Sequence, residues 1–194
     1  MNDMKRIIVT GATGSGKTTL AMALAGRMQI PGVDLDDLYW GPGWTPVPLE
    51  EFRAKTDHVT NQSNWALSGN YRVVRDLVWP RADTLIWLDY AFPLVFYRLT
   101  KRTISRVITG ELACNGNREN LAAIFGKDSI ILWLFKSYWR RKRETPKLLQ
   151  KPEHAHLAVH HFRSPHQTSL WLAGLPSPAG SPVVRPDVNT RTAT

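Results

Sequence analysis

The chain contains one short segment whose residue types and spacing are those of a phosphate-binding loop. Residues 11–18 read Gly-Ala-Thr-Gly-Ser-Gly-Lys-Thr and fit the pattern G-x-x-x-x-G-K-[ST]. Glycines let backbone N–H groups turn toward an anion, and a helix that begins near the lysine adds the positive end of its dipole. The pattern therefore predicts that the loop surrounds a polyphosphate, with Lys17 at the β- and γ-phosphates and the Thr18 hydroxyl on Mg²⁺.

The segments on both sides of the loop support this interpretation. Residues 6–10 carry the β-branched run of a buried strand, and residues 19–28 are rich in Ala, Leu and Met, which favour helices. Strand, glycine-rich loop and helix in this order are the structural context of the motif. The residues predicted to bind ATP are Gly11, Ala12, Thr13, Gly14, Ser15, Gly16, Lys17, Thr18 and Thr19.

An acidic cluster lies at the end of the second expected strand, which spans residues 32–36. It contains Asp34, Asp36 and Asp37. Because ligands bind at the carboxyl ends of parallel strands, an Asp here could accept a substrate proton or hold Mg²⁺ through water. Asp also favours helix starts, so one member could cap the next helix. We predict Asp36 as the catalytic member, and Asp36 or Asp89, which ends the fourth strand, as the water-mediated partner of Mg²⁺.

Cations are concentrated in one part of the chain. Residues 98–143 contain eleven Lys and Arg and three acids, so this segment holds +8 of the net charge of +9. Such a charge suits nucleotide phosphates or nucleic acid, and a solvated basic face is the remaining alternative. Arg72, after the third strand, could bind phosphate through two hydrogen bonds. We predict that Arg72, Arg102, Arg106 and Arg118 neutralise a transferring phosphoryl group.

The basic segment is expected to form a flap over the phosphate site. Its parts are a helix over residues 93–108, a mobile loop over 109–120 and a helix over 129–143. A flap of this kind would close on a substrate and exclude water.

Five expected strands alternate with helices along the chain. The strands span residues 6–10, 32–36, 65–67, 84–89 and 156–162. This alternation predicts the α/β class with a parallel sheet, and we expect a three-layer P-loop NTPase with strand order 2-3-1-4-5. Pro80 is expected to end a short helix. The domain is predicted to span residues 1–174, with the 98–143 flap inserted, and residues 175–194 to form a flexible tail.

Composition limits the class of protein. The 194 residues, 43% of them hydrophobic and 21% charged, suit one globular domain. No apolar run approaches the roughly 20 residues of a membrane helix, so we expect no membrane contact, and the early first strand is expected to leave no room for a signal peptide. The single Cys114 permits no internal disulfide, which favours a cytoplasmic location.

Taken together, the motifs resemble those of the adenylate-kinase-like P-loop proteins called DNA topology modulation proteins, which are FlaR-related. The resemblance covers most of residues 5–174. It rests on the phosphate loop and on residues 35–44, 65–71 and 81–89, including Leu35-Asp36-Asp37-Leu38-Tyr39-Trp40 and Gly69-Asn70-Tyr71. It implies a nucleotide-binding fold related to nucleoside monophosphate kinases, ATP binding and phosphoryl transfer as an expected activity. Its name implies a link to DNA supercoiling.

One position departs from the pattern of this family. The group usually has an acidic residue before Gly-Asn-Tyr, and here that residue is Ser68. A carboxylate that would organise the water on Mg²⁺ is therefore missing, so either Asp36 or Asp89 replaces it or catalysis is weak. The arginine of the kinase motif is matched by Arg72.

These observations lead to two principal hypotheses. The first is an ATP-dependent kinase that uses Mg²⁺ and phosphorylates a small molecule or a nucleotide. The alternative is a nucleotide-dependent protein that binds DNA through residues 98–143 without robust kinase activity. Because no helix-turn-helix or zinc module is recognisable, such DNA binding would be largely independent of sequence. A nucleotide sensor without chemistry is a third possibility, motivated by Ser68.

Overall fold

A five-stranded parallel sheet forms the centre of the computed structural model, which describes residues 4–119 and 129–176. The strands are β1 Arg6–Gly11, β2 Gly32–Asp34, β3 Trp65–Ser68, β4 Thr84–Leu88 and β5 Ala158–Phe162. They lie in the order β2-β3-β1-β4-β5, and all four pairings are parallel. The predicted sheet and its strand order are therefore confirmed.

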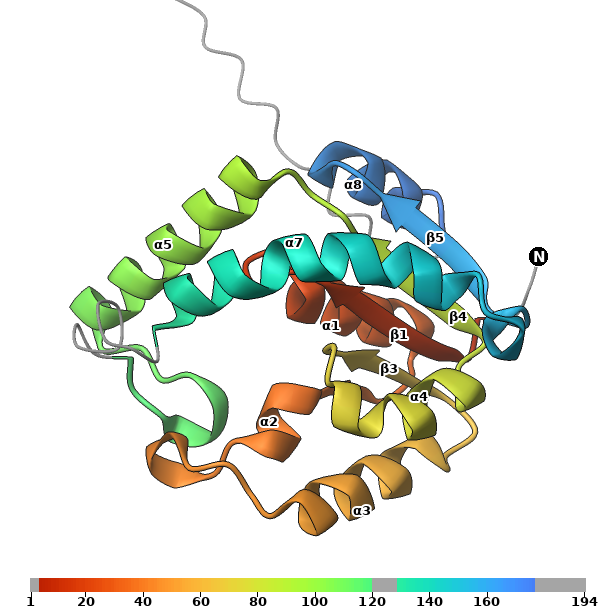
Figure 1. Ribbon diagram of the computed structural model, residues 1–194, viewed down its shortest axis with the longest axis horizontal. Coiled ribbons are helices and arrows are strands. Elements are labelled where there is room, and N and C mark those ends of the chain that lie inside the picture. The colour runs from red at the N-terminus through yellow and green to blue at the C-terminus, as the bar shows by residue number, and fades with distance from the viewer. Residues whose placement is uncertain (1–3, 120–128, 177–194) are drawn as a thin grey trace, which may run out of the picture.

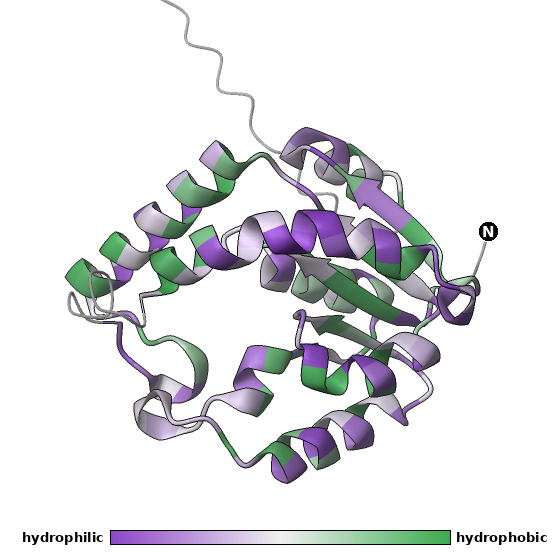
Figure 2. Cartoon of the chain, viewed as in Figure 1, coloured by the Kyte–Doolittle hydropathy of each residue, from purple (hydrophilic) through white to green (hydrophobic). Residues whose placement is uncertain are grey.

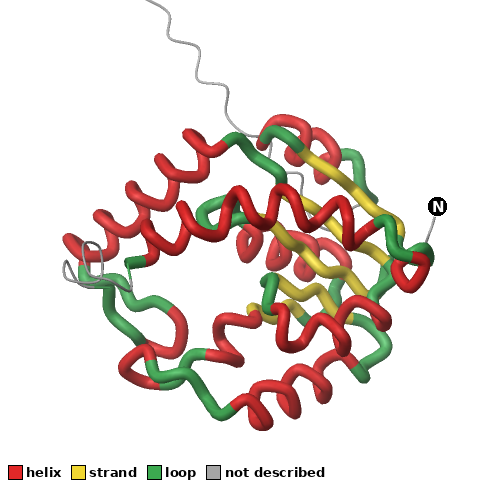
Figure 3. The backbone as a smooth tube through the Cα atoms, viewed as in Figure 1, coloured by secondary structure: helices red, strands yellow, loops and turns green. Residues whose placement is uncertain are grey.

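Helices cover both faces of this sheet (Figures 1 and 3). They are α1 Lys17–Met28, α2 Leu35–Tyr39, α3 Leu49–Thr60, α4 Arg75–Arg81, α5 Phe92–Thr109, α7 Ile130–Leu149 and α8 Pro165–Ala173. Residues of α1, α5 and the first half of α7 share one buried core, and residues of α3 and α4 share a second. These two cores make the three-layer arrangement.

The central strands are apolar on both faces, as parallel strands between two helix layers must be. In β1, Ile7 and Val9 point into the first core, whereas Ile8 points into the second. In β4, Ile86 points into the first core and Leu85 points into the second. Figure 2 shows the resulting concentration of hydrophobic residues on the central strands.

Several boundaries differ from those expected. β2 ends at Asp34 instead of residue 36, because the Asp34 carboxylate accepts a hydrogen bond from the Asp36 N–H (3.0 Å) and caps α2. Pro80 lies inside α4, which continues to Arg81, so the prediction that Pro80 ends this helix is wrong by one residue. The second flap helix, α7, runs six residues beyond the expected end at residue 143.

The loop after α5 has defined contacts where the sequence suggested mobility. Asn115 Nδ2 donates to the carbonyls of Asp37 (2.7 Å) and Trp40 (2.6 Å). Asn117 Nδ2 donates to the Gly41 carbonyl at 2.9 Å. These contacts attach the loop to the segment that follows α2.

Most of the expected tail lies outside the described residues. Its first two residues, Leu175 and Pro176, accept hydrogen bonds from Arg27 Nε of α1 (3.1 Å each). Within the described residues, no helix is both long enough and apolar enough to cross a membrane.

Candidate functional site

The glycine-rich segment forms a loop between the end of β1 and the start of α1. Gly14 and Gly16 have positive φ angles of 84° and 88°, which L side chains rarely adopt. A Cβ atom on Gly14 would also lie 2.5 Å from the Val95 carbonyl oxygen of α5. Helix α1 begins at Lys17 without a side-chain cap, so its first N–H groups are directed to the loop as an anion site requires.

Lys17 bends back over this loop. Its Nζ atom donates a hydrogen bond to the Ala12 carbonyl at 3.1 Å. Burial, followed by the positive charge of Arg141, lowers the pKa of Lys17 to about 8, while the carboxylates of Asp36 and Asp34 act in the opposite direction. Lys17, two carboxylates and an arginine of α7 therefore share one electrostatic environment.

The Thr18 hydroxyl is paired with the carboxylate that ends β2. Thr18 Oγ1 donates to Asp34 Oδ2 at 2.5 Å, and Ser68 Oγ donates to Thr18 Oγ1 at 3.3 Å. The register of the sheet places Asp34 directly opposite Ser68 on β3. Asp34 belongs to the acidic cluster but was not the predicted partner of Thr18. Because Asp is favoured at helix starts, the sequence could indicate that Asp34 caps α2. The capping preference gives no indication that Asp34 also contacts Thr18.

Asp36 lies beside an aromatic wall. Tyr71 donates its hydroxyl to Asp36 Oδ1 at 2.5 Å. The ring of Tyr71 packs against those of Tyr39 and Phe52, at centroid distances of 4.9 and 5.1 Å. Burial raises the pKa of Tyr71, and the negative charge of Asp36 raises it further, so Tyr71 remains a hydrogen-bond donor. This contact fixes the orientation of the carboxylate predicted to be catalytic.

The predicted arginines occupy different surroundings. Arg102 lies in electrostatic range of both Lys17 and Asp36; burial lowers its pKa, and Arg106 lowers it further. Arg106 forms ion pairs with Glu119 (3.2 Å) and Glu111 (3.9 Å).

The other two predicted arginines, Arg72 and Arg118, are exposed. Within the described parts of the chain, neither forms a side-chain hydrogen bond or ion pair with the glycine-rich loop, unlike Lys17 and Arg141.

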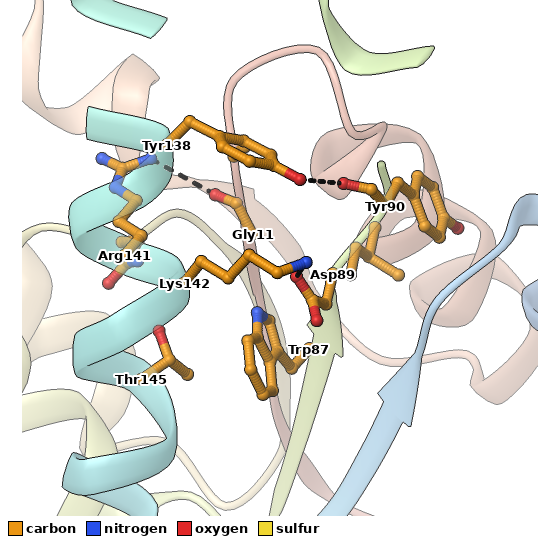
Figure 4. Close-up of a pocket in the computed structure, with 11 residues that line it drawn as sticks. Gly11, Trp87, Asp89, Tyr90, Tyr138, Arg141, Lys142 and Thr145 are labelled. Carbon is orange, nitrogen blue, oxygen red and sulfur yellow. Dashed lines mark hydrogen bonds and ion pairs between the residues drawn. The ribbon is translucent and has the colours of Figure 1, made fainter. Parts of the chain in front are cut away.

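Sequence reasoning counted Arg141 only as one of many cations in the basic segment. Its Nη1 atom donates to the Gly11 carbonyl at 3.3 Å, so α7 reaches back to the start of the loop (Figure 4). Tyr138, one turn earlier, donates to the Tyr90 carbonyl at 2.9 Å and holds α7 in this position. The run of cations at residues 140–143 gives no indication of which member faces inward, because that depends on the packing of α7.

Asp89 is contacted by a lysine and a histidine. Its Oδ1 atom is 3.2 Å from Lys142 Nζ, and its Oδ2 atom is 3.1 Å from His161 Nε2. The His161 ring stacks on Trp87 with a centroid distance of 4.1 Å. The water-mediated role of Asp89 at Mg²⁺ stays a prediction, and Asp34 is the carboxylate that contacts Thr18 directly.

The strand order and the glycine-rich loop between β1 and α1 define an α/β P-loop NTPase fold. Solved structures with this fold include a shikimate kinase from Bacteroides thetaiotaomicron, 19% identical, with a TM-score of 0.51 over 88% of this chain and 95% of that chain. A sugar kinase from Janibacter sp. HTCC2649 is 17% identical, with a TM-score of 0.50 over 88% of this chain and 92% of that chain. At these identities the likeness is evidence for the fold alone.

No family model matches the chain, and no curated protein matches it. The resemblance to DNA topology modulation proteins is therefore supported only as far as the P-loop fold.

The buried Asn117 amide is expected to hold the loop after α5 in place. It is 4% exposed and also accepts a hydrogen bond from the Trp44 N–H at 2.9 Å. Asn117→Ala leaves this N–H and the Gly41 carbonyl unpaired, at a cost of about 2 kcal/mol. Hydrogen exchange at the Trp44 amide should accelerate by roughly 30-fold. Asn61→Ala, which removes an exposed amide just after α3, should leave this exchange unchanged, and equal rates in both variants would contradict the assignment.

Proposed function

We propose that this protein is an ATP-dependent kinase that phosphorylates a hydroxyl group of a small molecule. One observation carries the proposal: the Thr18–Asp34 contact and the Tyr71-oriented Asp36 both lie in the electrostatic environment of Lys17. Phosphoryl transfer requires mainly positioning and charge stabilisation. A loop for phosphates, an oxygen pair for a metal and a separate carboxylate for the acceptor are the groups that this chemistry needs.

Residues 11–19 are proposed to hold the triphosphate, with Lys17 at its β- and γ-phosphates. The hydroxyls of Ser15 and Thr10 are buried and have no hydrogen-bond partner within the part of the chain that the structure describes. Ser15 lies in the loop itself, whereas Thr10 is the β1 residue just before it. An unpaired donor in a phosphate loop supports a bound anion, because leaving it unpaired is costly.

The donor atoms near Thr18 suit Mg²⁺. Its hydroxyl and the Asp34 carboxylate are oxygen ligands, and no cluster of three or more His, Cys, Asp or Glu for a metal occurs in residues 4–119 and 129–176. Few protein ligands together with substrate phosphates are typical of Mg²⁺ sites. When bound, Mg²⁺ neutralises phosphate charge. Since Asp34 lies opposite Ser68, it supplies a carboxylate beside the position where the β3 acid is missing.

Asp36 is proposed to orient or deprotonate the acceptor hydroxyl, and Tyr71 to hold Asp36 in place. Arg102, together with Arg141, is proposed to stabilise the charge on the transferring group. Arg106 is also a candidate, provided that its ion pair with Glu119 breaks and the substrate takes the place of Glu119. Arg118 remains a candidate that closure of the 98–143 flap would have to bring in. Arg72, which follows β3 outside the flap, also remains a candidate.

An ATP turnover assay against nucleoside monophosphates and small alcohols tests the proposal. We expect Mg²⁺-dependent ADP release that requires one class of acceptor. Binding of ATP without turnover for any acceptor would favour the nucleotide sensor instead.

The lowered pKa of Lys17 predicts how ATP binding depends on pH. Only protonated Lys17 attracts phosphate, and the free protein loses this proton as the pH rises through about 8. Bound phosphates raise the pKa of Lys17, so binding takes up a proton. Affinity for ATP should fall by about tenfold between pH 8 and 9.5. Titration calorimetry in buffers of different ionisation enthalpy measures both effects, and the same uptake in Lys17→Ala would refute the assignment.

DNA binding through residues 98–143 is the alternative, and it has less support. Several of its cations have partners inside the protein, because Arg106 and Lys142 form ion pairs and Arg141 contacts the loop. ATP-independent DNA affinity that falls steeply with salt concentration would favour this alternative.

A further inference from the structure

Arg75 is a partly buried cation at the edge of the proposed acceptor site. It begins α4, shortly after the Gly69–Tyr71 turn that ends β3. Its guanidinium carbon lies 5.0 Å from the centre of the Trp79 ring, which is 4% exposed. Its Nε atom is buried and has no hydrogen-bond partner among residues 4–119 and 129–176.

Neighbouring arginines on the same side of the sheet are paired. Arg53 forms two hydrogen bonds with the Asp76 carboxylate, at 3.0 and 2.6 Å. Arg81 forms an ion pair with Asp57 at 2.8 Å. Arg75 forms no such pair within the described residues; burial and then Arg72 lower its pKa, and the charge of Glu144 only partly offsets them. A cation–π contact offsets little of the cost of burying a donor, so an unpaired Nε–H suggests that a ligand completes the site.

The hollow beside Arg75 leads toward the proposed catalytic carboxylate. It is lined by Leu35, Gly69, Asn70, Tyr71 and Trp79, and Tyr71 bonds to Asp36. Asn70 also lines the neighbouring hollow that contains Arg141. Asn70 is therefore common to both hollows, and Tyr71 connects the hollow beside Arg75 to Asp36.

The hollow beside Arg75 lies against the core on the α3 and α4 side of the sheet. Leu35 and Trp79 belong to the core on the α3 and α4 side of the sheet, whereas the buried residues of α1 belong to the opposite core. A ligand at Arg75 is therefore expected to belong to the acceptor and not to the ATP triphosphate.

We propose that Arg75 binds an anionic group of the acceptor, so that the acceptor is a hydroxy acid or a hydroxyl-bearing phosphate ester. A planar guanidinium suits both carboxylate and phosphate. The identification of this ligand as the acceptor rests on the proposed kinase function, but binding of the anion requires no turnover. The two claims can therefore fail separately.

Side-chain NMR of the Arg Nε–H groups tests the binding directly. In Lys17→Ala protein, which weakens anion binding at the loop, inorganic phosphate and lactate are titrated separately, with glycerol as the neutral probe. We expect a saturable shift of the Arg75 Nε–H signal with one or both anions and none with glycerol. The anion that binds distinguishes a phosphate ester from a carboxylate. No shift with either anion, or an equal response to glycerol, overturns the proposal.

Calorimetry with Arg75→Gln provides the matched comparison. Affinity for the anion should fall at least tenfold, whereas Arg53→Gln, which removes a paired guanidinium nearby, should leave it unchanged. The melting temperature of Arg75→Gln should not fall, because the variant removes an unpaired buried donor. Arg75→Lys separates the need for charge from the need for a planar group. Unchanged affinity in Arg75→Gln contradicts the site.

Kinetics then connect the site to the acceptor. For any acceptor that is turned over, Arg75→Gln should raise the acceptor KM at least tenfold and leave the ATP KM unchanged. A neutral acceptor that is used as efficiently as its anionic analogues would overturn the proposal even if kinase activity is established.

Discussion

Replacing Lys17 with alanine is expected to reduce ATP-dependent phosphoryl transfer by about 10³-fold while leaving the fold intact. The Lys17 ammonium is the cation that bends over the loop, and loss of a preorganised donor at a developing charge has effects of this size. The protein should not be destabilised, because burial and Arg141 already disfavour the charged form of Lys17, as its lowered pKa indicates. The measurements are steady-state turnover and thermal unfolding followed by circular dichroism.

Lys55→Ala is the matched control for this prediction. Lys55 is an exposed lysine of α3 that pairs with Glu51 one turn earlier, and surface pairs of this kind contribute little. Its activity should equal that of the unmodified chain. Full activity in Lys17→Ala would show that residues 11–18 are not the site of transfer.

Asp36→Asn is expected to lower kcat by about 10²- to 10⁴-fold, the usual contribution of a general base. The amide keeps the size of the side chain and can still accept the Tyr71 hydrogen bond, so geometry should persist while the basic oxygen is lost. Affinity for ATP should change by less than about threefold, because Asp34 and not Asp36 contacts Thr18.

The neighbouring Asp37 provides the control for this change. It lies on the same short helix, α2, but is exposed, so Asp37→Asn should retain kcat. If Asp36→Asn retains the kcat of the unmodified chain, Asp36 is not the catalytic carboxylate. Turnover at saturating ATP, together with ATP titration calorimetry, separates these results.

Local sequence patterns were sufficient for the architecture. The glycine-rich loop is recognisable because its conformation requires glycine at positions such as Gly14 and Gly16, where φ is positive. Strands β1 and β4 are recognisable because parallel strands buried on both faces need continuous apolar runs. Boundaries were less accurate where side chains decide them, as at Asp34, whose carboxylate ends β2 by capping α2.

The composition of the candidate site depended on contacts between distant residues. Asp34 meets Thr18 and Ser68 because the β2–β3 register places residues far apart in sequence opposite each other. Arg141 reaches Gly11 because one face of α7 packs inward. Neither the register nor the helix orientation is encoded in a local pattern.

By itself, the sequence determined the α/β class and a loop shaped for phosphate, since these follow from backbone conformation and hydrophobic periodicity along short stretches. The strand order was expected by analogy with the P-loop kinase arrangement and is confirmed by the structure. Only the tertiary structure decided which charges meet. In the structure, Arg106 pairs with Glu119, and Asp89 contacts Lys142 and His161. Arg75 lies beside Trp79 and has no ion pair within the described residues. The reason is physical: the partner of a side chain depends on how separate helices and strands pack, and that packing is a property of the whole chain.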